Sequence, residues 1–238
     1  MIVRLIRLSL LVVIPAFNEA NSIGNVIQDI RIHIPSASIL VVDDGSRDKT
    51  VQVAESANVN VLALPFNVGV GGALRAGFLY AYRNSFTQVL QIDADGQHRA
   101  EHAKILLESA DGFDIVIGSR FAESKNNYDA SFLRRLAIRL LSAAISKICK
   151  TKLTDVTSGF RLSSSSAIEL FMKDYPVEYL GDTVESLVIA HKLGLSIKEV
   201  PVLMSKREFG SPSQNVLKSS WYLARAFLVI ILSLIHRK

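Results

Sequence analysis

The chain has 238 residues, of which 49% are hydrophobic and 21% are charged, and its formal net charge is +5 at pH 7. This composition provides enough apolar material for the core of one α/β domain and excludes an intrinsically disordered chain. The basic balance favours an anionic partner, whether nucleotide, phosphate, nucleic acid or acidic membrane, without choosing among them.

The first hundred residues alternate between strand and helix patterns. Residues 1–20 run from an apolar stretch straight into Pro15, Asn18 and Glu19 without a small-residue cleavage pattern, which favours a first strand over a signal peptide. Further strands are predicted by the apolar runs at residues 37–43, 59–65 and 87–92. Helices are predicted at residues 22–34, 48–57 and 68–84. Such alternation predicts a mostly parallel sheet with helices on both faces.

The second half continues with predicted helices at residues 100–110, 132–150 and 181–194, and with strands at 114–121 and 196–204. In the helix over 132–150, the spacing predicts an apolar face formed by Phe132, Leu136, Leu140 and Ala143. The single cysteine, Cys149, excludes an internal disulfide, favours a reducing compartment and is expected to be a small buried residue.

One domain is predicted over residues 1–213, followed by an apolar helix over 214–238. The apolar run of this helix is interrupted by Arg225 and is short of the ~20 residues that a membrane span needs. Trp221 and Tyr222 at one end and Arg237 and Lys238 at the other favour a membrane interface. Packing on the domain or on another subunit is the alternative.

Acidic residues fall at the predicted strand ends: Glu19, the pair Asp43–Asp44, and Asp93 with Asp95. Adjacent parallel strands deliver their carboxyl ends to one crevice, where grouped carboxylates need a cation or hydroxyl and amino donors. We therefore predict that Asp93 and Asp95 hold Mg²⁺ or Mn²⁺, with Gln97 as a third oxygen ligand. The alternative is that D-x-D only opens a surface turn.

Glycines at 69, 71 and 72 precede the predicted helix over 68–84. Their backbone N–H groups can approach a phosphate, so Gly71 is a candidate donor-binding residue. The spacing fits G-x-G-x-x-G only loosely, because Leu74 occupies the third position, which argues against a nicotinamide site. A tight turn with close helix packing is the other interpretation.

The chain carries, in this order, VVIPAFNEA, VVDDGSRDKT, NVGVGGALRAGF, QIDADGQH, VIGSRF, DVTSGFRL and EVPVLMSKREFGSPS. This series resembles family 2 glycosyltransferases with a GT-A fold, and more closely the branch of dolichyl- or polyprenyl-phosphate sugar synthases. The resemblance covers residues 10–215, most of the chain. It implies an inverting, metal-dependent transfer of a sugar from GDP- or UDP-sugar to a polyprenyl phosphate.

The resemblance also implies roles for single residues. Nucleotide contacts fall on Pro15, Phe17, Glu19, Asp44 and Ala94, and phosphate contacts on Arg120, Arg207 and Ser213, with Arg134 or Arg135 as further candidates. Asp93, Asp95 and Gln97 match the metal and diphosphate site. A solvated basic face is the alternative for the arginines.

The need for a general base depends on the acceptor. A lipid phosphate is largely dianionic at neutral pH and needs none, whereas a hydroxyl acceptor does. Asp155, Asp182 and Glu185 are the candidates, although Gly181 stands where many family members carry another acid. His98, beside the D-x-D pair, is expected to be a solvated loop residue.

The leading hypothesis is therefore a polyprenyl-phosphate glycosyltransferase in peripheral contact with the cytoplasmic face of a membrane, alone, as a homo-oligomer or with a membrane partner subunit. A transferase acting on a saccharide hydroxyl in envelope polysaccharide synthesis is the alternative. A non-catalytic nucleotide-binding subunit ranks lower. Nucleic-acid binding is not expected, because it would explain the charge but not the acids at the strand ends.

Overall fold

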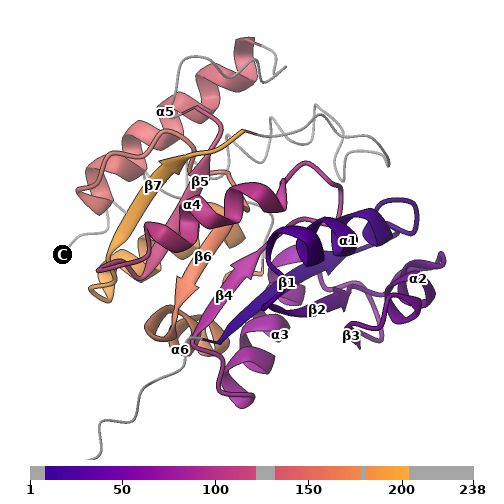
Figure 1. Ribbon diagram of the computed structural model, residues 1–238. Coiled ribbons are helices and arrows are strands. Elements are labelled where there is room, and N and C mark those ends of the chain that lie inside the picture. Colours follow the sequence, from indigo (N-terminus) through magenta and orange to yellow (C-terminus); the bar gives the residue numbers. More distant parts are fainter. Residues whose placement is uncertain (1–8, 122–131, 178–180, 204–238) are drawn as a thin grey trace, which may run out of the picture.

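A computed structural model of the chain describes residues 9–121, 132–177 and 181–203 (Figure 1). The predicted site residues Arg207 and Ser213, the side chain of Arg134 and the helix predicted over 214–238 lie outside the described residues. None of the described helices is long and apolar enough to cross a membrane.

The described strands form a seven-stranded sheet in the order β3-β2-β1-β4-β6-β5-β7. They are β1 (Leu10–Ala16), β2 (Ser38–Asp43), β3 (Asn60–Ala63), β4 (Gln88–Gln91), β5 (Ile115–Ser119), β6 (Arg161–Ser164) and β7 (Ile197–Pro201). Strand β6 runs antiparallel to both β4 and β5, and the other neighbouring pairs are parallel. The predicted mostly parallel α/β sheet is thus confirmed.

Helices cover both faces of this sheet, as predicted. They are α1 (Ile23–His33), α2 (Thr50–Ser56), α3 (Val70–Arg83), α4 (Ala103–Glu108), α5 (Phe132–Cys149), α6 (Ser165–Lys173) and α7 (Ser186–Lys192), with a 3-10 turn η1 (Ala100–His102) and a π-helical turn η2 (Gly181–Glu185). Figure 1 shows α1 and α4 in front of the sheet and α3 and α6 behind it.

The strand residues explain why both faces are covered. In β1, Leu11 and Val13 pack with α3, α5, α6 and α7, whereas Val12 and Ile14 pack with α1, α2 and α4. Successive side chains of a strand point to opposite faces, so an unbroken apolar run must be buried on both sides. Two hydrophobic cores result, one on each side of the sheet.

Helix α6 is not among the elements predicted from the sequence. Ser164 caps it, accepting a hydrogen bond from the backbone N–H of Ala167, and Ile168 and Phe171 are buried against α3. A serine followed by apolar residues at helical spacing is the signal that marks this start.

Helix α5 exists as predicted, but its predicted apolar face is not the buried one among the described side chains, which do not include that of Phe132. Leu136 and Leu140 are 43% and 55% exposed, whereas Ile138, Leu141 and Ile145 are buried. The helix has apolar residues on more than one side, and contact with α7 decides which side is buried. Cys149 is buried as expected, and burial raises the pKa of its thiol to about 11.

This correction predicts opposite outcomes for two neighbouring leucines. Leu141→Ala should lower the free energy of unfolding by about 2–5 kcal/mol, because it leaves a cavity in the core. Leu140→Ala should change it by less than about 0.5 kcal/mol. Denaturant unfolding followed by circular dichroism measures both, and equal losses would contradict the assigned face.

Candidate active site

The loops that follow β1 and β2 are tied to each other at the carboxyl edge of the sheet. The backbone N–H of Asn18 donates to Ser46 Oγ at 2.9 Å, and Asn18 Oδ1 accepts from the N–H of Arg47 at 2.8 Å. The N–H of Glu19 donates to Thr50 Oγ1 at 2.8 Å. These bonds hold the two loops in one relative position, so residues from both can contact one ligand.

The predicted nucleotide residues of the first loop lie at this edge. Phe17 directly follows β1 and its side chain is 44% exposed, so the ring is accessible for stacking. Pro15 is half-buried in β1, and the carboxylate of Glu19 accepts from Ser22 Oγ at 2.8 Å. The nucleotide contacts themselves stay predictions.

The adjacent aspartates at the end of β2 do different work. Both carboxylate oxygens of Asp44 accept backbone N–H groups, from Val68 at 2.7 Å and from Gly69 at 2.9 Å. Burial raises the pKa of Asp44, while these two amides act against the rise and the neighbouring Asp43 adds to it. The side chain that the sequence assigned to a base or ribose therefore anchors the glycine-rich turn.

Asp43 carries an oxygen that the described residues leave unsatisfied. Its Oδ2 accepts from the N–H of Ser46 at 3.0 Å, but its buried Oδ1 has no hydrogen-bond partner within the described ranges. A buried acceptor left without a donor costs about 1–3 kcal/mol. An N–H donor of a ligand would remove that cost, which makes Asp43 a candidate that the sequence interpretation passed over in favour of Asp44.

Gly71 is explained by packing. A Cβ at this position would meet the carbonyl oxygen of Pro176 and the Cα of Val177 at 2.7 Å or less. Only glycine lets the first turn of α3 approach that backbone so closely. The structure supports the interpretation as close helix packing, and the contact with the donor stays a prediction.

The D-x-D pair lies in the turn that follows β4. The side chain of Asp93 is 38% exposed, and Asp95 Oδ1 accepts from the N–H of Gln97 at 3.0 Å. Ala94 points away, since its side chain is buried in the core beside α1. The predicted nucleotide contact at Ala94 would therefore have to come from its backbone.

The donor set fits a hard divalent cation. Within the described ranges, no group of three or more His, Cys, Asp or Glu side chains could hold a metal by itself. Two carboxylates and one amide oxygen, completed by waters and substrate phosphates, are what Mg²⁺ prefers. Asp93, Asp95 and Gln97 therefore remain the predicted ligands, in the turn that follows β4.

His98 is a buried structural partner of Asp93 and not the solvated residue predicted from the sequence. Its Nδ1 accepts from the backbone N–H of Asp93 at 3.0 Å, and its Nε2 lies 3.6 Å from Asp93 Oδ2. The ring stacks on Phe160, with centroids 5.2 Å apart. His98 thus fixes the backbone of Asp93 and lies beside its carboxylate.

Asp155 and Arg120 form a buried, bidentate ion pair. Arg120 Nε donates to Asp155 Oδ2 at 2.6 Å and Arg120 Nη2 to Oδ1 at 2.8 Å, while Thr157 Oγ1 also donates to Oδ1. Burial by itself would raise the pKa of Asp155, but the charge and hydrogen bonds of Arg120 hold it below its ordinary value. Arg120 and Thr157 occupy both oxygens of this fully buried carboxylate, which makes Asp155 a weak candidate for a general base. Nε and Nη2 of Arg120 are likewise engaged by Asp155.

Asp182 fits the general-base role better. It is 6% exposed, and it lies in the π-helical turn η2 that precedes α7. Burial raises the pKa of its carboxyl to about 6, with the charge of Arg161 opposing the rise and that of Asp93 adding to it. A carboxylate with a pKa close to neutrality is the kind that can accept a proton during turnover. Glu185, the third candidate, is exposed.

The segment 155–161 joins these acids. Ser158 Oγ donates to the carbonyl of Gly118 at 2.6 Å, which fixes the segment to β5. A Cβ on Gly159 would lie 3.1 Å from Asp93 Oδ1 and 2.9 Å from Gln91 Nε2. The backbone of Gly159 therefore forms the floor under the Asp93 carboxylate.

A hollow of about 360 Å³ lies at the opposite edge of the sheet, near the start of β4. Two of its hydroxyls are already paired within the protein: Ser164 Oγ donates to Asp114 Oδ1 and Ser165 Oγ to the carbonyl of Thr87. It is distant in the fold from the acidic edge and presents no unsatisfied group that calls for a ligand.

The fold has a solved counterpart. Glucosyl-3-phosphoglycerate synthase from Mycobacterium tuberculosis, in complex with Mn²⁺ and UDP-glucose, matches with a TM-score of 0.71 and 23% identity, over 94% of this chain and 78% of that one. Together with the D-x-D turn, this likeness defines a GT-A fold of the kind that nucleotide-sugar glycosyltransferases use. The family model described as glycosyl transferase family 2 matches residues 11–171. The chain belongs to this family and is a nucleotide-sugar-dependent glycosyltransferase.

Relatives match over most of their length. The undecaprenyl-phosphate mannosyltransferase of Micrococcus luteus is 30% identical over 211 residues, which are 86% of this chain and 87% of the relative. The UDP-N-acetylglucosamine–dolichyl-phosphate N-acetylglucosaminyltransferase of Methanococcus voltae is 29% identical, over 80% of this chain and 83% of the relative. These two proteins differ in the sugar that their names specify.

The buried pair predicts a stability effect for Asp155. Asp155→Asn should lower the free energy of unfolding at pH 7 by about 3–5 kcal/mol, because it leaves the buried Arg120 charge uncompensated. Since the folded-state pKa is depressed, this contribution is complete above pH ~4 and fades as the pH falls further. Denaturant unfolding at several pH values should show that the difference in the free energy of unfolding between the wild type and Asp155→Asn becomes smaller below pH ~4. If Asp155→Asn were as stable as the wild type but inactive, this result would instead favour Asp155 as the general base.

The floor under Asp93 predicts an effect on the cation. Gly159→Ala should displace the Asp93 carboxylate and weaken Mn²⁺ binding by about tenfold, as changes beside metal ligands do. Gly24→Ala is the matched control, because its new Cβ would meet only Val53 Cγ1 at 3.4 Å, on α1. Isothermal titration with Mn²⁺ measures both variants, and equal affinities would contradict the assignment.

Proposed function

We propose that the protein transfers a sugar from a nucleoside diphosphate sugar to a polyprenyl phosphate, with inversion at the anomeric carbon. The observation that carries this proposal is the gathering of Asp93, Asp95 and Asp182 at one edge of a glycosyltransferase sheet. It is supported by relatives, matched over most of their length, whose names specify undecaprenyl or dolichyl phosphate.

The donor would bind across the loops that follow β1, β2 and β4. Phe17 offers an exposed ring to the base, and the buried Oδ1 of Asp43 offers an acceptor to one of its N–H groups. Both UDP- and GDP-sugars carry such an N–H, so this contact does not select between them. Asp93, Asp95 and Gln97 would hold Mg²⁺ or Mn²⁺, which supplies positive charge to the leaving diphosphate. Arg120, Arg207 and Ser213 stay the predicted phosphate contacts.

The acceptor decides what Asp182 does. A lipid monophosphate is largely dianionic at neutral pH and can attack without giving up a proton. In that reaction the ionised Asp182 orients the acceptor side of the crevice and removes no proton. Because such an acceptor is held in a membrane, the same proposal includes peripheral contact with the cytoplasmic face of a membrane. It also includes association as a homo-oligomer or with a membrane partner subunit.

A hydroxyl acceptor is the second candidate, and Asp182 favours it. Burial raises the pKa of this carboxyl to about 6, so at pH 7 it is mostly ionised yet basic enough to accept a hydroxyl proton. Activity towards a hydroxyl acceptor would fall as the pH drops through about 6, because the base becomes protonated.

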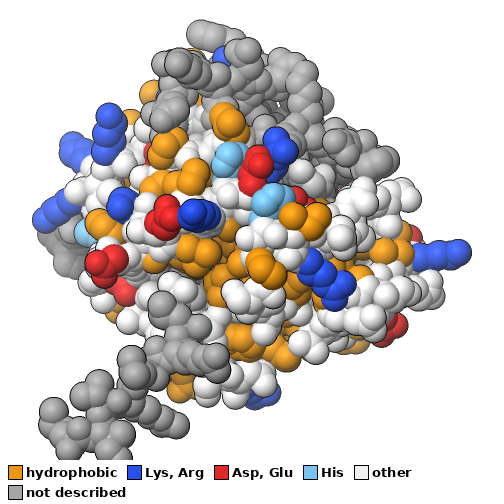
Figure 2. Space-filling model, in the orientation of Figure 1, with side chains coloured by type: hydrophobic (Ala, Val, Ile, Leu, Met, Phe, Trp, Pro, Cys, Tyr) orange, Lys and Arg blue, Asp and Glu red, His pale blue; other side chains and the backbone are white. Residues whose placement is uncertain are grey.

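Nucleic acid receives no support as a partner from the face covered by α1 and α4. Figure 2 shows its Lys and Arg side chains spread among hydrophobic and acidic ones instead of gathered in one basic patch. An electrostatic footprint for nucleic acid would gather those charges on one surface.

The test is transfer of radiolabelled sugar from a panel of nucleotide sugars to undecaprenyl or dolichyl phosphate, with Mg²⁺ or Mn²⁺ and with EDTA. We expect label in the organic phase, lost with EDTA. Asp182→Asn should then keep kcat within about tenfold, whereas with a hydroxyl acceptor it should lose 10²–10⁴-fold, the usual contribution of a general base. Metal-dependent hydrolysis of the donor without any lipid product would contradict the lipid acceptor and favour a hydroxyl acceptor. No turnover of any nucleotide sugar would contradict both.

A further inference from the structure

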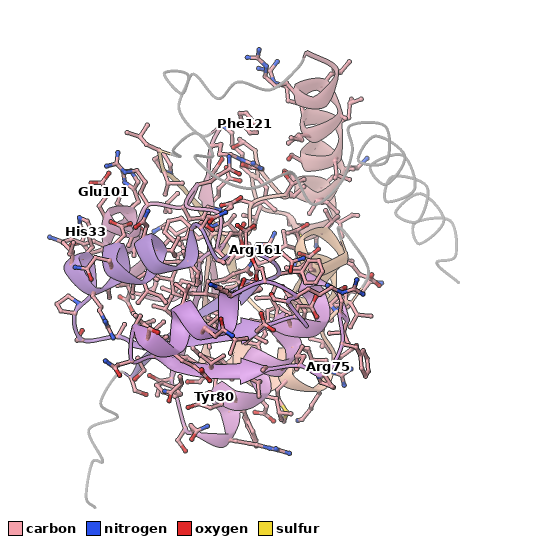
Figure 3. All side chains as sticks on the ribbon, turned by 90° about the vertical axis from the view of Figure 1, so that its right-hand side faces the viewer. His33, Arg75, Tyr80, Glu101, Phe121 and Arg161 are labelled. Carbon is pink, nitrogen blue, oxygen red and sulfur yellow. The ribbon has the colours of Figure 1, made fainter. Side chains whose placement is uncertain are left out.

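Arg161 is a buried cation without a carboxylate in direct contact. It begins β6, where it pairs with Gln91 of β4 and Ile117 of β5, and it is 5% exposed. Figure 3 shows it in the middle of the molecule, far from surface residues such as Glu101. None of the described salt bridges includes it.

Neutral oxygens hold the Arg161 guanidinium from two segments. Nε donates to the carbonyl of Ser158 at 2.8 Å, and Nη2 donates to the carbonyls of Val156 at 2.9 Å and Thr183 at 2.7 Å. Nη1 donates to Ser186 Oγ at 3.1 Å. One side chain thus joins segment 155–161 to the turn η2 that carries Asp182.

The link continues to Asp182 itself. Ser186 Oγ donates to the backbone carbonyl of Asp182 at 2.6 Å, and Tyr175 Oη donates to the same carbonyl at 2.8 Å. The bond from Ser186 connects to Arg161, and the bond from Tyr175 comes from the chain after α6. Of these two donors to the Asp182 carbonyl, Ser186 is the one that is itself hydrogen-bonded to Arg161.

Burying an arginine among neutral groups is costly unless nearby charges compensate it. Burial lowers the pKa of Arg161, and the neighbouring groups that oppose this are the Tyr175 phenol and the acids Asp182, Asp155 and Asp93. A guanidinium stays protonated even so, since its ordinary pKa lies far above neutrality. Asp155 already has Arg120, so Asp182 and Asp93 are the acids that depend on Arg161 for positive charge.

We propose that Arg161 is a positioning residue for glycosyl transfer, which locks the Asp182 turn against segment 155–161 and supplies the fixed positive charge that the carboxylates of Asp182 and Asp93 share. The groups facing Asp182 are Arg161 from β6, Tyr175 from beyond α6 and Asp93 from beyond β4. The role of Arg161 in glycosyl transfer rests on the proposed function.

The charge can be tested without any acceptor. Arg161→Gln removes a cation from the neighbourhood of Asp93, so Mn²⁺ should bind roughly threefold tighter or more in isothermal titration. A merely structural role predicts the opposite, because a loosened turn binds the ion less well. Arg161→Lys keeps the charge and should restore the wild-type Mn²⁺ affinity. Weaker binding by both variants would overturn the electrostatic part.

The lock is tested by kcat for sugar transfer with saturating donor and Mn²⁺. Arg161→Lys loses most of the four hydrogen bonds. It should lower kcat about three- to tenfold with a polyprenyl phosphate, and more with a hydroxyl acceptor, with little change in the KM for the donor. Folding of each variant is checked by circular dichroism. Full kcat in a folded Arg161→Lys protein would overturn the proposal.

If the arginine variants do not fold, a pair of milder variants, each lacking one hydroxyl, tests the same link. Ser186→Ala and Tyr175→Phe each remove one hydrogen bond to the Asp182 carbonyl, but only the first also breaks a bond to Arg161. We expect Ser186→Ala to lower kcat about three- to tenfold and Tyr175→Phe by less than about twofold. Equal effects would overturn the lock. Because the Mn²⁺ titration needs no acceptor, a wrong acceptor assignment and a wrong role for Arg161 give different results.

Discussion

Repulsion among carboxylates at one edge of the sheet is the constraint on which the rest of this site depends. Asp93 and Asp95 follow β4, Asp155 precedes β6, and Asp182 lies in η2. Like charges that share a low-dielectric region can stay ionised only when cations lie among them. The protein places two guanidiniums in its interior for this purpose and leaves the remaining negative charge for a cation and a substrate.

The two arginines solve the problem in different ways. Arg120 closes a bidentate pair with Asp155, and the charge of that acid is used up within the protein. Arg161 keeps its distance, held by carbonyl and hydroxyl oxygens, so its field reaches Asp182 and Asp93 without neutralising either by contact. The site therefore keeps two carboxylates that are not in contact with a guanidinium, and that of Asp93 is 38% exposed.

The antiparallel direction of β6 places segment 155–161 beside the acids. A parallel strand would begin at the other edge of the sheet, whereas β6 begins at the carboxyl ends of β4 and β5 and brings segment 155–161 beside the acids. Arg161 lies opposite Gln91, Gly159 lies against the Asp93 carboxylate, and Phe160 stacks on His98. One short segment thus contacts the D-x-D turn, the buried ion pair and the Asp182 turn.

The sequence by itself determined the features that depend on short-range patterns. Apolar runs and helical spacing predicted the alternating strands and helices, and the D-x-D turn after the strand at 87–92 was visible as a candidate cation site. Only the tertiary structure decided which side of α5 is buried, that Asp155 pairs with Arg120, that His98 is buried, and that Arg161 links segment 155–161 to η2. The reason is that burial and charge pairing depend on residues distant along the chain: Arg120 and Asp155 are 35 positions apart, and Arg161 and Thr183 are 22 apart. No local pattern records which of several acids will meet an arginine, because that is settled only when the strands carrying them lie side by side.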